Sequence, residues 1–319
     1  MKYSFLVLFC ILHFSVQGQS VSKQSTPLTI GEVKTISSSI LKEERTLNIY
    51  LPQNYDATKS YPVIYLLDGS RNEDFLHITG LVQFFNLQFK MPDCILVGIA
   101  NIERKKDFTF YTDKKDFQKE FPTTGHSAEF INFIEKELQP FIQSQYKTNG
   151  TNYLIGQSLG GLLATEIVLK RPNLFSHYLI VSPSLWWDDE SLLTQAPELL
   201  SKSSLQSKYI YIAVGKKEHP VMQKDAETLF AILQKAQLKD TKIEKMPFLE
   251  EITLEKHKEC KNCWARNLCV GACPNENLVN AGTTQKSDSK NCRFIQAMYN
   301  DLIHAYLELT VENKKQLLG

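Results

Sequence analysis

The sequence predicts an α/β protein in which a mostly parallel sheet is covered by helices. Five short and continuously apolar runs are typical of parallel strands buried on both faces, namely Tyr61–Leu67, Cys94–Ala100, Tyr153–Ile155, Tyr178–Val181 and Tyr209–Val214. Two of the intervening segments, Ser127–Tyr146 and Val221–Ala236, carry apolar residues at helical spacing. Alternation of such strands and helices indicates a single α/β sheet with right-handed crossovers.

Two segments before the first buried run have the pattern of edge strands. In Leu28–Ile40 and Arg45–Pro52, polar and apolar residues alternate, which predicts an antiparallel pair. The composition is that of a globular protein, with 43% hydrophobic and 22% charged residues among 319. The 36 Lys and Arg residues balance 35 Asp and Glu residues, so the charge gives no reason to expect a nucleic-acid partner.

The N-terminus has the three parts of a signal peptide. Lys2 supplies the positive charge, Phe5–Val16 is mostly apolar, and Gly18 is a small residue at the expected cleavage point. This apolar run is shorter than the roughly 20 residues that cross a bilayer, so we expect no stable membrane anchor. Residues 1–18 therefore predict a periplasmic or secreted protein.

The most informative motif is Gly156-Gln-Ser-Leu-Gly-Gly161, which lies between a predicted strand and a predicted helix over Leu162–Lys170. In a nucleophile elbow, a serine occupies a strained strand-to-helix turn and needs small neighbours on both sides. The turn also directs amides at the start of the helix toward the oxyanion of acyl transfer. The motif therefore indicates Ser158 as a nucleophile, the alternative being a purely structural glycine turn.

Several motifs in order along the chain resemble the putative-esterase branch of the α/β hydrolases, which includes siderophore and feruloyl esterases. They are Tyr65–Gly69, Asp107–Thr109, Gly156–Gly161 and Ser182–Asp188, within a resemblance that spans Leu28–Lys245. The resemblance implies an α/β-hydrolase fold and hydrolysis of a small-molecule ester through a seryl acyl-enzyme, without a cofactor.

The same resemblance implies further roles around Ser158. The oxyanion hole would combine the amide of Leu159 with an amide at Gly69 or just after it. Asp68 either takes a direct catalytic part or fixes the loop at the end of its strand. Trp186 and Trp187 either line the acyl pocket or belong to the core.

The triad acid is expected after the strand Tyr209–Val214, where Glu218 is the first choice. Asp225 is the alternative, although a position on the following helix suits a solvated or capping carboxylate. The family's histidine would follow a strand near residues 241–248, yet none occurs there, so the hydrolase lacks its usual final part. His257 is the candidate base, with His126 and His219 as alternatives; without a base, Ser158 is a weak nucleophile.

A cysteine-rich segment replaces the expected ending. Its C-x2-C-x5-C-x3-C pattern and one later cysteine resemble a SPASM domain, the C-terminal module of radical S-adenosylmethionine peptide maturases, over residues 248–312. The resemblance implies a 4Fe–4S cluster on Cys260, Cys263, Cys269 and Cys292, while Cys273 would belong to a second cluster. The motif for the catalytic cluster is absent, so this module cannot perform radical chemistry alone.

The join between the two resemblances lies near residues 245–248 and indicates a fusion or a chimeric gene. Four thiolates could also bind zinc in tetrahedral geometry. In an exported protein, which meets an oxidising environment, the cysteines form disulfides more readily than they bind an iron–sulfur cluster. Unligated thiols are a further possibility. Two functions stay open: an ester hydrolase impaired by the missing histidine, and a metal-binding module on a catalytically silent hydrolase fold. The sequence identifies no partner protein.

Overall fold

A computed structural model describes residues 26–202, 209–245, 260, 262–265, 289–309 and 313. Contacts divide the chain into Met1–Ile30 and Gly31–Gly319. The described residues of the first unit, 26–30, contain no helix or strand, and every element below belongs to the second. The predicted signal peptide lies outside the described residues. Among the helices that are described, none is long and apolar enough to cross a bilayer.

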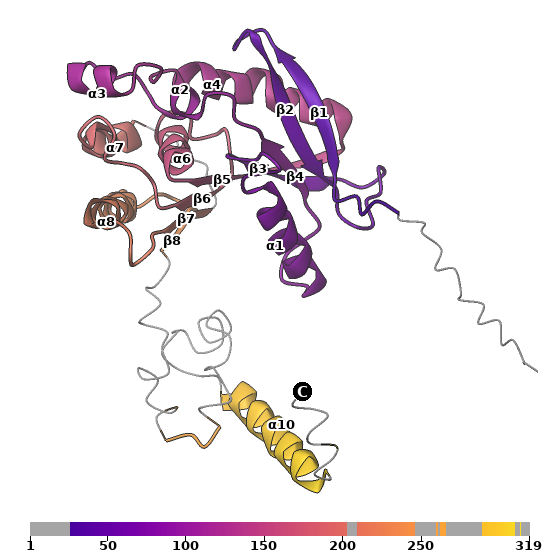
Figure 1. The fold of residues 1–319 in the computed structure, drawn as a ribbon. Coiled ribbons are helices and arrows are strands. Elements are labelled where there is room, and N and C mark those ends of the chain that lie inside the picture. The colour runs from indigo at the N-terminus through magenta and orange to yellow at the C-terminus, as the bar shows by residue number, and fades with distance from the viewer. Residues whose placement is uncertain are drawn as a thin grey trace, which may run out of the picture. The chain divides into compact units, whose positions relative to one another are not determined.

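An eight-stranded sheet forms the centre of the fold (Figure 1), in the order β1-β2-β4-β3-β5-β6-β7-β8. The strands are β1 Glu32–Ser38, β2 Glu43–Tyr50, β3 Tyr61–Leu66, β4 Ile95–Ile99, β5 Thr148–Gln157, β6 His177–Val181, β7 Tyr209–Ala213 and β8 Lys242–Lys245. β1 pairs with β2 and β2 with β4 in antiparallel fashion, and β4, β3 and β5 to β8 are mutually parallel. The predicted α/β class, the antiparallel edge pair and the five parallel strands are therefore confirmed.

Helices follow most of the strands. They are α1 Phe75–Leu87, α2 Arg104–Phe108, α3 Lys115–Glu120, α4 Ser127–Phe133, the π-helix Ile134–Leu138, α5 Gln139–Gln145, α6 Leu159–Lys170, α7 Ser191–Ser201, α8 Pro220–Lys235 and α10 Ser289–Glu308. The predicted helix over Ser127–Tyr146 thus corresponds to α4, the π-helix and α5, which follow one another without a break. The predicted helix over Val221–Ala236 corresponds to α8.

The two faces of the sheet are covered differently. On one face, Leu154, Ile180 and Ile210 are fully buried in the main core, to which α4, α5, α6, α7 and α8 all contribute. On the other face, Phe75 and Val82 of α1 form a second, smaller core cluster. Figure 1 places α1 on the opposite side of the sheet from α4 and α6.

A buried ion pair connects the antiparallel edge of the sheet to α2. The guanidinium of Arg45 on β2 donates to the carboxylate of Asp107, and both side chains are only 1% exposed. Burial raises the pKa of Asp107, while the Arg45 charge opposes that rise. This pair holds α2, whose first residue, Arg104, reaches the candidate active site.

Candidate active site

Ser158 occupies a strained turn between β5 and α6. Its backbone has φ 57° and ψ −117°, a conformation that is uncommon for a residue other than glycine. A Cβ atom on Gly156 would lie 2.3 Å from the Gly160 oxygen, and one on Gly161 would lie 2.9 Å from the Pro183 Cα. The glycines of the motif therefore allow the close backbone contacts that a nucleophile elbow requires.

The hydroxyl of Ser158 faces a second serine. Its Oγ lies 3.3 Å from Oγ of Ser184, which is buried in the loop after β6. The backbones are also joined, since the Ser184 amide donates to the Ser158 carbonyl at 3.0 Å and the Ser158 amide donates to Val181 O at 3.0 Å. The loop after β6 thus holds the elbow from one side.

Glu218 lies in the loop after β7, as predicted. Its carboxylate accepts hydrogen bonds from the Ser182 hydroxyl and, at 3.4 Å, from the Gly215 amide. Ser182 is buried, has φ 42°, and donates its amide to Ala213 O at 2.7 Å. The carboxyl ends of β5, β6 and β7 therefore bring together Ser158, the two loop serines and Glu218, with Glu218 bonded to the loop that touches Ser158.

Asp68, at the end of β3, is held in a two-point ion pair. Arg104 donates from Nε to Oδ1 at 2.6 Å and from Nη2 to Oδ2 at 2.9 Å, and Asn101 donates to Oδ1 at 2.7 Å. The hydrogen bond to Asp68 raises the pKa of Arg104. Arg104 Nη2 also donates to the carbonyl of Gln157 at 3.2 Å. Asp68 therefore links the end of β3 to the elbow, which supports the loop-fixing role.

The two predicted oxyanion amides differ in their surroundings. Leu159 is the first residue of α6, where amides have no acceptor within the helix. The Gly69 amide instead donates to Ile99 O at 2.9 Å, so Gly69 is a correction to the prediction: this amide is engaged by β4. The next amide, that of Ser70, donates to the Glu73 carboxylate at 3.3 Å.

None of the histidines within the described residues lies at hydrogen-bond distance from Ser158 Oγ. His126 is half-exposed beside Glu129, at 3.7 Å from Nδ1 to Oε1. The Nδ1 of His219 accepts from the Val221 amide at 3.3 Å and caps α8. His257, the candidate base, lies outside the described residues.

The two tryptophans have different environments. Trp187 is only 2% exposed, donates from Nε1 to Phe110 O at 2.9 Å, and meets Phe117 edge-on at 5.2 Å between ring centroids. It is a core residue, which is the second of the two predicted alternatives and excludes Trp187 from the substrate pocket. Trp186 is half-buried against the same core and remains a candidate for the pocket lining.

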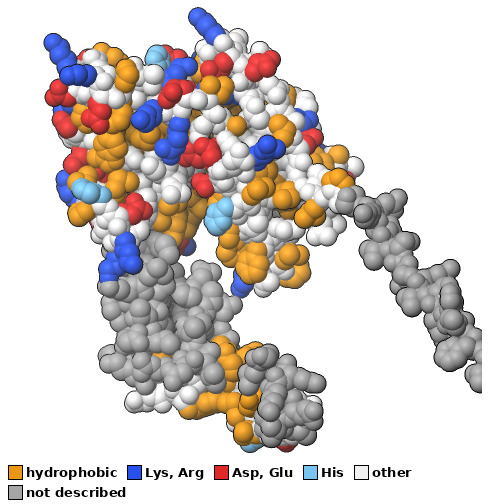
Figure 2. All heavy atoms as spheres, viewed as in Figure 1, with side chains coloured by type: hydrophobic (Ala, Val, Ile, Leu, Met, Phe, Trp, Pro, Cys, Tyr) orange, Lys and Arg blue, Asp and Glu red, His pale blue; other side chains and the backbone are white. Residues whose placement is uncertain are grey.

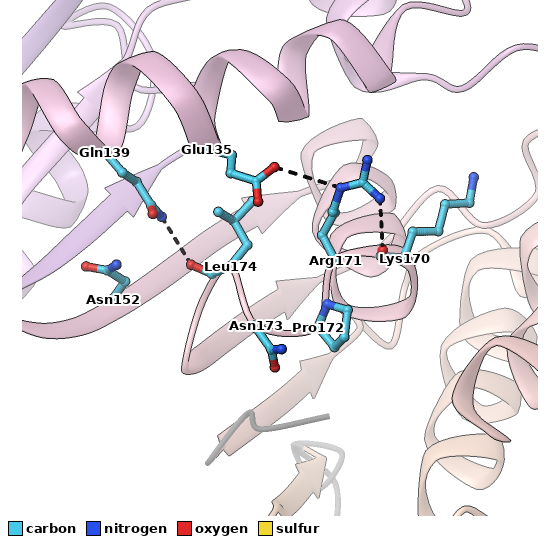
Figure 3. A pocket seen from close by; sticks show the side chains of 8 residues that line it. All are labelled: Glu135, Gln139, Asn152, Lys170, Arg171, Pro172, Asn173 and Leu174. Carbon is cyan, nitrogen blue, oxygen red and sulfur yellow. Dashed lines mark hydrogen bonds and ion pairs between the residues drawn. The ribbon is translucent and has the colours of Figure 1, made fainter. Parts of the chain in front are cut away.

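A polar pocket of about 390 Å³ lies away from these groups (Figure 3). Its lining comes from the π-helix, α5, β5, the end of α6 and the turn between α6 and β6, and it includes Glu135, Gln139, Asn152, Lys170, Arg171 and Leu174. This turn precedes β6, whereas Ser158 follows β5, so the pocket opens near the amino ends of the parallel strands. It contains none of the predicted catalytic residues.

In the cysteine-rich segment, the structure describes Cys260, Cys263 and Cys292 but not Cys269 or Cys273. The Cys263 amide donates to Cys260 O at 3.2 Å, which closes a turn. The Cys263 sulfur accepts from Gln296 Nε2 at 3.3 Å, one helical turn after Cys292 on α10. Among the described residues, no three potential ligands are grouped for a metal ion.

Asp225, the alternative acid, is completely buried on α8. Within the described part of the chain, neither carboxylate oxygen has a hydrogen-bond partner, and the nearest cation, Lys224 Nζ, is 3.9 Å from Oδ1. Lys224 is instead bound to Glu190 at 2.9 Å. Burial, and then repulsion by Glu190, raise the pKa of Asp225 from 3.8 to about 6. Asp225 is therefore a buried acid that shares no hydrogen bond with Ser158, Ser182 or Ser184.

Between pH 3.8 and 6, the unfolded chain releases the Asp225 proton before the folded chain does, so the folded state loses stability as pH rises. Asp225→Asn should therefore raise the free energy of unfolding by about 2–3 kcal/mol at pH 7.5 and by little at pH 4. Urea denaturation at both pH values measures this difference. Asp113→Asn, at an exposed position, serves as the control. An equal effect of Asp225→Asn at both pH values would contradict the raised pKa.

Comparison with known proteins identifies relatives of this chain. Residues 38–247 match the protein family described as "Putative esterase". Ferri-bacillibactin esterase BesA from Bacillus subtilis is 31% identical over 210 residues, which cover 59% of this chain and 70% of BesA.

Two solved structures are similar in fold and sequence. An IroE-like serine hydrolase from Shewanella oneidensis has a TM-score of 0.62 and 33% identity, covering 68% of this chain and 73% of the hydrolase. The BES protein from Bacillus cereus has a TM-score of 0.63 and 28% identity, covering 72% and 91% of the two chains.

Proposed function

This chain belongs to the Putative esterase family, and on that premise we propose that it hydrolyses carboxylic esters with Ser158 as its nucleophile. The observation that carries the proposal is the backbone of Ser158, which is strained at φ 57° in the turn between β5 and α6. That turn leaves Ser158 half-exposed at the carboxyl edge of the sheet. The relatives named as an esterase and a serine hydrolase support the same reaction class.

In the proposed reaction, Ser158 Oγ attacks the ester carbonyl as a base accepts its proton. The oxyanion receives hydrogen bonds from the Leu159 amide and from a second amide just after Gly69. For this second donor we propose Ser70, whose amide would exchange its 3.3 Å hydrogen bond to the Glu73 carboxylate for one to the oxyanion, whereas the Gly69 amide is held within the sheet by Ile99 O. The alcohol then leaves with a proton, and water hydrolyses the acyl-enzyme by the same steps. Glu218 acts as the acid that orients the base and steadies the loop through Ser182.

The base we propose is His257, which is the one histidine between β8 and α10. It lies beyond residues 241–248, where the resemblance to the esterases implies the histidine, so we propose slow turnover. The substrate is a small-molecule ester, and the reaction requires no cofactor. Residues 1–18 support export to the periplasm or the medium.

Ser158→Ala should reduce turnover of p-nitrophenyl butyrate at least about 1,000-fold, because the nucleophile is lost while the fold remains. Ser144→Ala, on the exposed side of α5, is the matched control and should keep wild-type kcat/KM. Initial rates, with circular dichroism to verify folding, provide the measurement. Retained turnover in Ser158→Ala would reject Ser158 as the nucleophile.

His257→Ala separates the base from the nucleophile in the same assay. If His257 is the base, this variant loses turnover nearly as severely as Ser158→Ala, and the loss is greatest at low pH where an alternative hydroxide route is scarce. Unchanged kcat/KM in His257→Ala would reject His257 while leaving Ser158 in place.

A second proposed function concerns the SPASM-like segment, 248–312. The family match ends at residue 247, and beyond it Gln296 on α10 contacts the Cys260–Cys263 turn one helical turn after Cys292. Thiolates from a C-x2-C turn and a helix are suitable ligands for a 4Fe–4S cluster or zinc. We propose a single site on Cys260, Cys263, Cys269 and Cys292, with Cys273 outside it.

The chain without residues 1–18, reconstituted anaerobically with iron and sulfide, should bind at most one cluster and absorb broadly near about 400 nm. Cys263→Ser should abolish that absorption and the bound iron, whereas Cys273→Ser should preserve both. Elemental analysis gives the stoichiometry, with zinc as the competing metal. Equal losses from the two variants would contradict the ligand set, and disulfides in place of bound metal would reject the site.

A further inference from the structure

One face of the sheet is incompletely covered from β5 to β7. Pairing in register places Ile155 beside Leu179 and Leu179 beside Tyr211, so these side chains lie on the same face. All three are half-buried, whereas their neighbours on the opposite face, Leu154 and Ile210, are 0% exposed. Interior parallel strands are normally covered on both faces, so this apolar surface lacks part of its cover.

Helix α1 covers only the beginning of that face. Its Phe75 and Val82 pack with residues of β2, β3 and β4, and Tyr153 and Ile155 of β5 border this cluster. The outer side of α1 is itself apolar, with Leu81 39% and Phe84 55% exposed. Figure 2 shows hydrophobic side chains at the surface of this helix. Helix α1 therefore leaves the sheet beyond β5 uncovered, and its own outer side exposes apolar side chains.

Helix α10 carries an exposed apolar stripe that could cover an apolar sheet face. Phe294, Met298 and Leu302 are spaced by four residues and are 68%, 39% and 56% exposed. Gln296, which contacts Cys263, is two positions after Phe294, roughly 200° around the helix. The stripe thus lies on the side of α10 away from the cysteine turn.

We propose that this stripe of α10 packs on the open face of β5–β7 beside α1, where it completes the second helical layer of the same molecule. Residues 246–288 separate β8 from α10, and 43 residues are more chain than is needed to cross a sheet of this size. A tethered partner acts at an effective concentration of about millimolar, far above that of a second copy at micromolar protein. The occupant is therefore α10 of the same chain.

A photocrosslinking residue on the open face tests this packing directly in the full chain. In one variant Tyr211 is replaced by p-benzoylphenylalanine, and in a second variant Tyr153 is replaced by the same residue. Two positions are used because either substitution alone could disturb folding. After irradiation, mass spectrometry should locate crosslinks within residues 294–302, in a product of monomer mass. The same group at Lys235, exposed on α8 and on the other layer, should give no such crosslink.

Substitutions on α10 provide the matched comparison. Met298→Asp combined with Leu302→Asp should lower the crosslink yield at least about fivefold, because a charge cannot be buried against an apolar face without a partner. Asn300→Asp, exposed on another side of α10, should leave the yield unchanged. Crosslinks at dimer mass would assign the face to a second copy and overturn the proposal. Folded variants that crosslink to no residue of α10 would overturn it as well.

Discussion

The close approach of two backbone segments at the end of β5 is the constraint on which the site depends. Gly156 lies against the Gly160 carbonyl so tightly that no Cβ fits between them, and the chain passes from strand to helix through a single residue with positive φ. That residue is Ser158, so the residue with the strained backbone is also the one whose hydroxyl lies at the carboxyl edge of the sheet. The packing of α6 on β5 and β6 supplies the stability that holds this turn.

Neighbouring strands support the turn from both sides. The loop after β6 contacts it through Ser184 and is itself bound to Glu218, while Asp68 after β3 reaches it through Arg104. Four neighbouring strands, β3, β5, β6 and β7, thus contribute polar groups to one edge, which is how a parallel sheet assembles a site from distant parts of the sequence. The remaining group for ester hydrolysis is a base. The resemblance to the esterases implies a histidine after the last strand, where the family match ends at residue 247.

Local chemistry explains what could be predicted from the sequence. Continuous apolar runs identified the parallel strands, and the glycines around Ser158 identified the elbow, because each signal is local. Helix α1 was missed because Leu76, Leu81 and Phe84 give it apolar residues on more than one side. The bond from the Gly69 amide to Ile99 and the burial of Trp187 against Phe110 depend on contacts between distant segments, which no spacing reveals.

We propose that the strained turn activates one serine for acyl transfer. Reaction of the full chain with a fluorophosphonate, followed by peptide mass spectrometry, tests it most directly because the reagent marks an activated serine irrespective of substrate. We expect a single stoichiometric adduct on Ser158, which forms more slowly in His257→Ala. An adduct on another serine, or no adduct on folded protein, would contradict it.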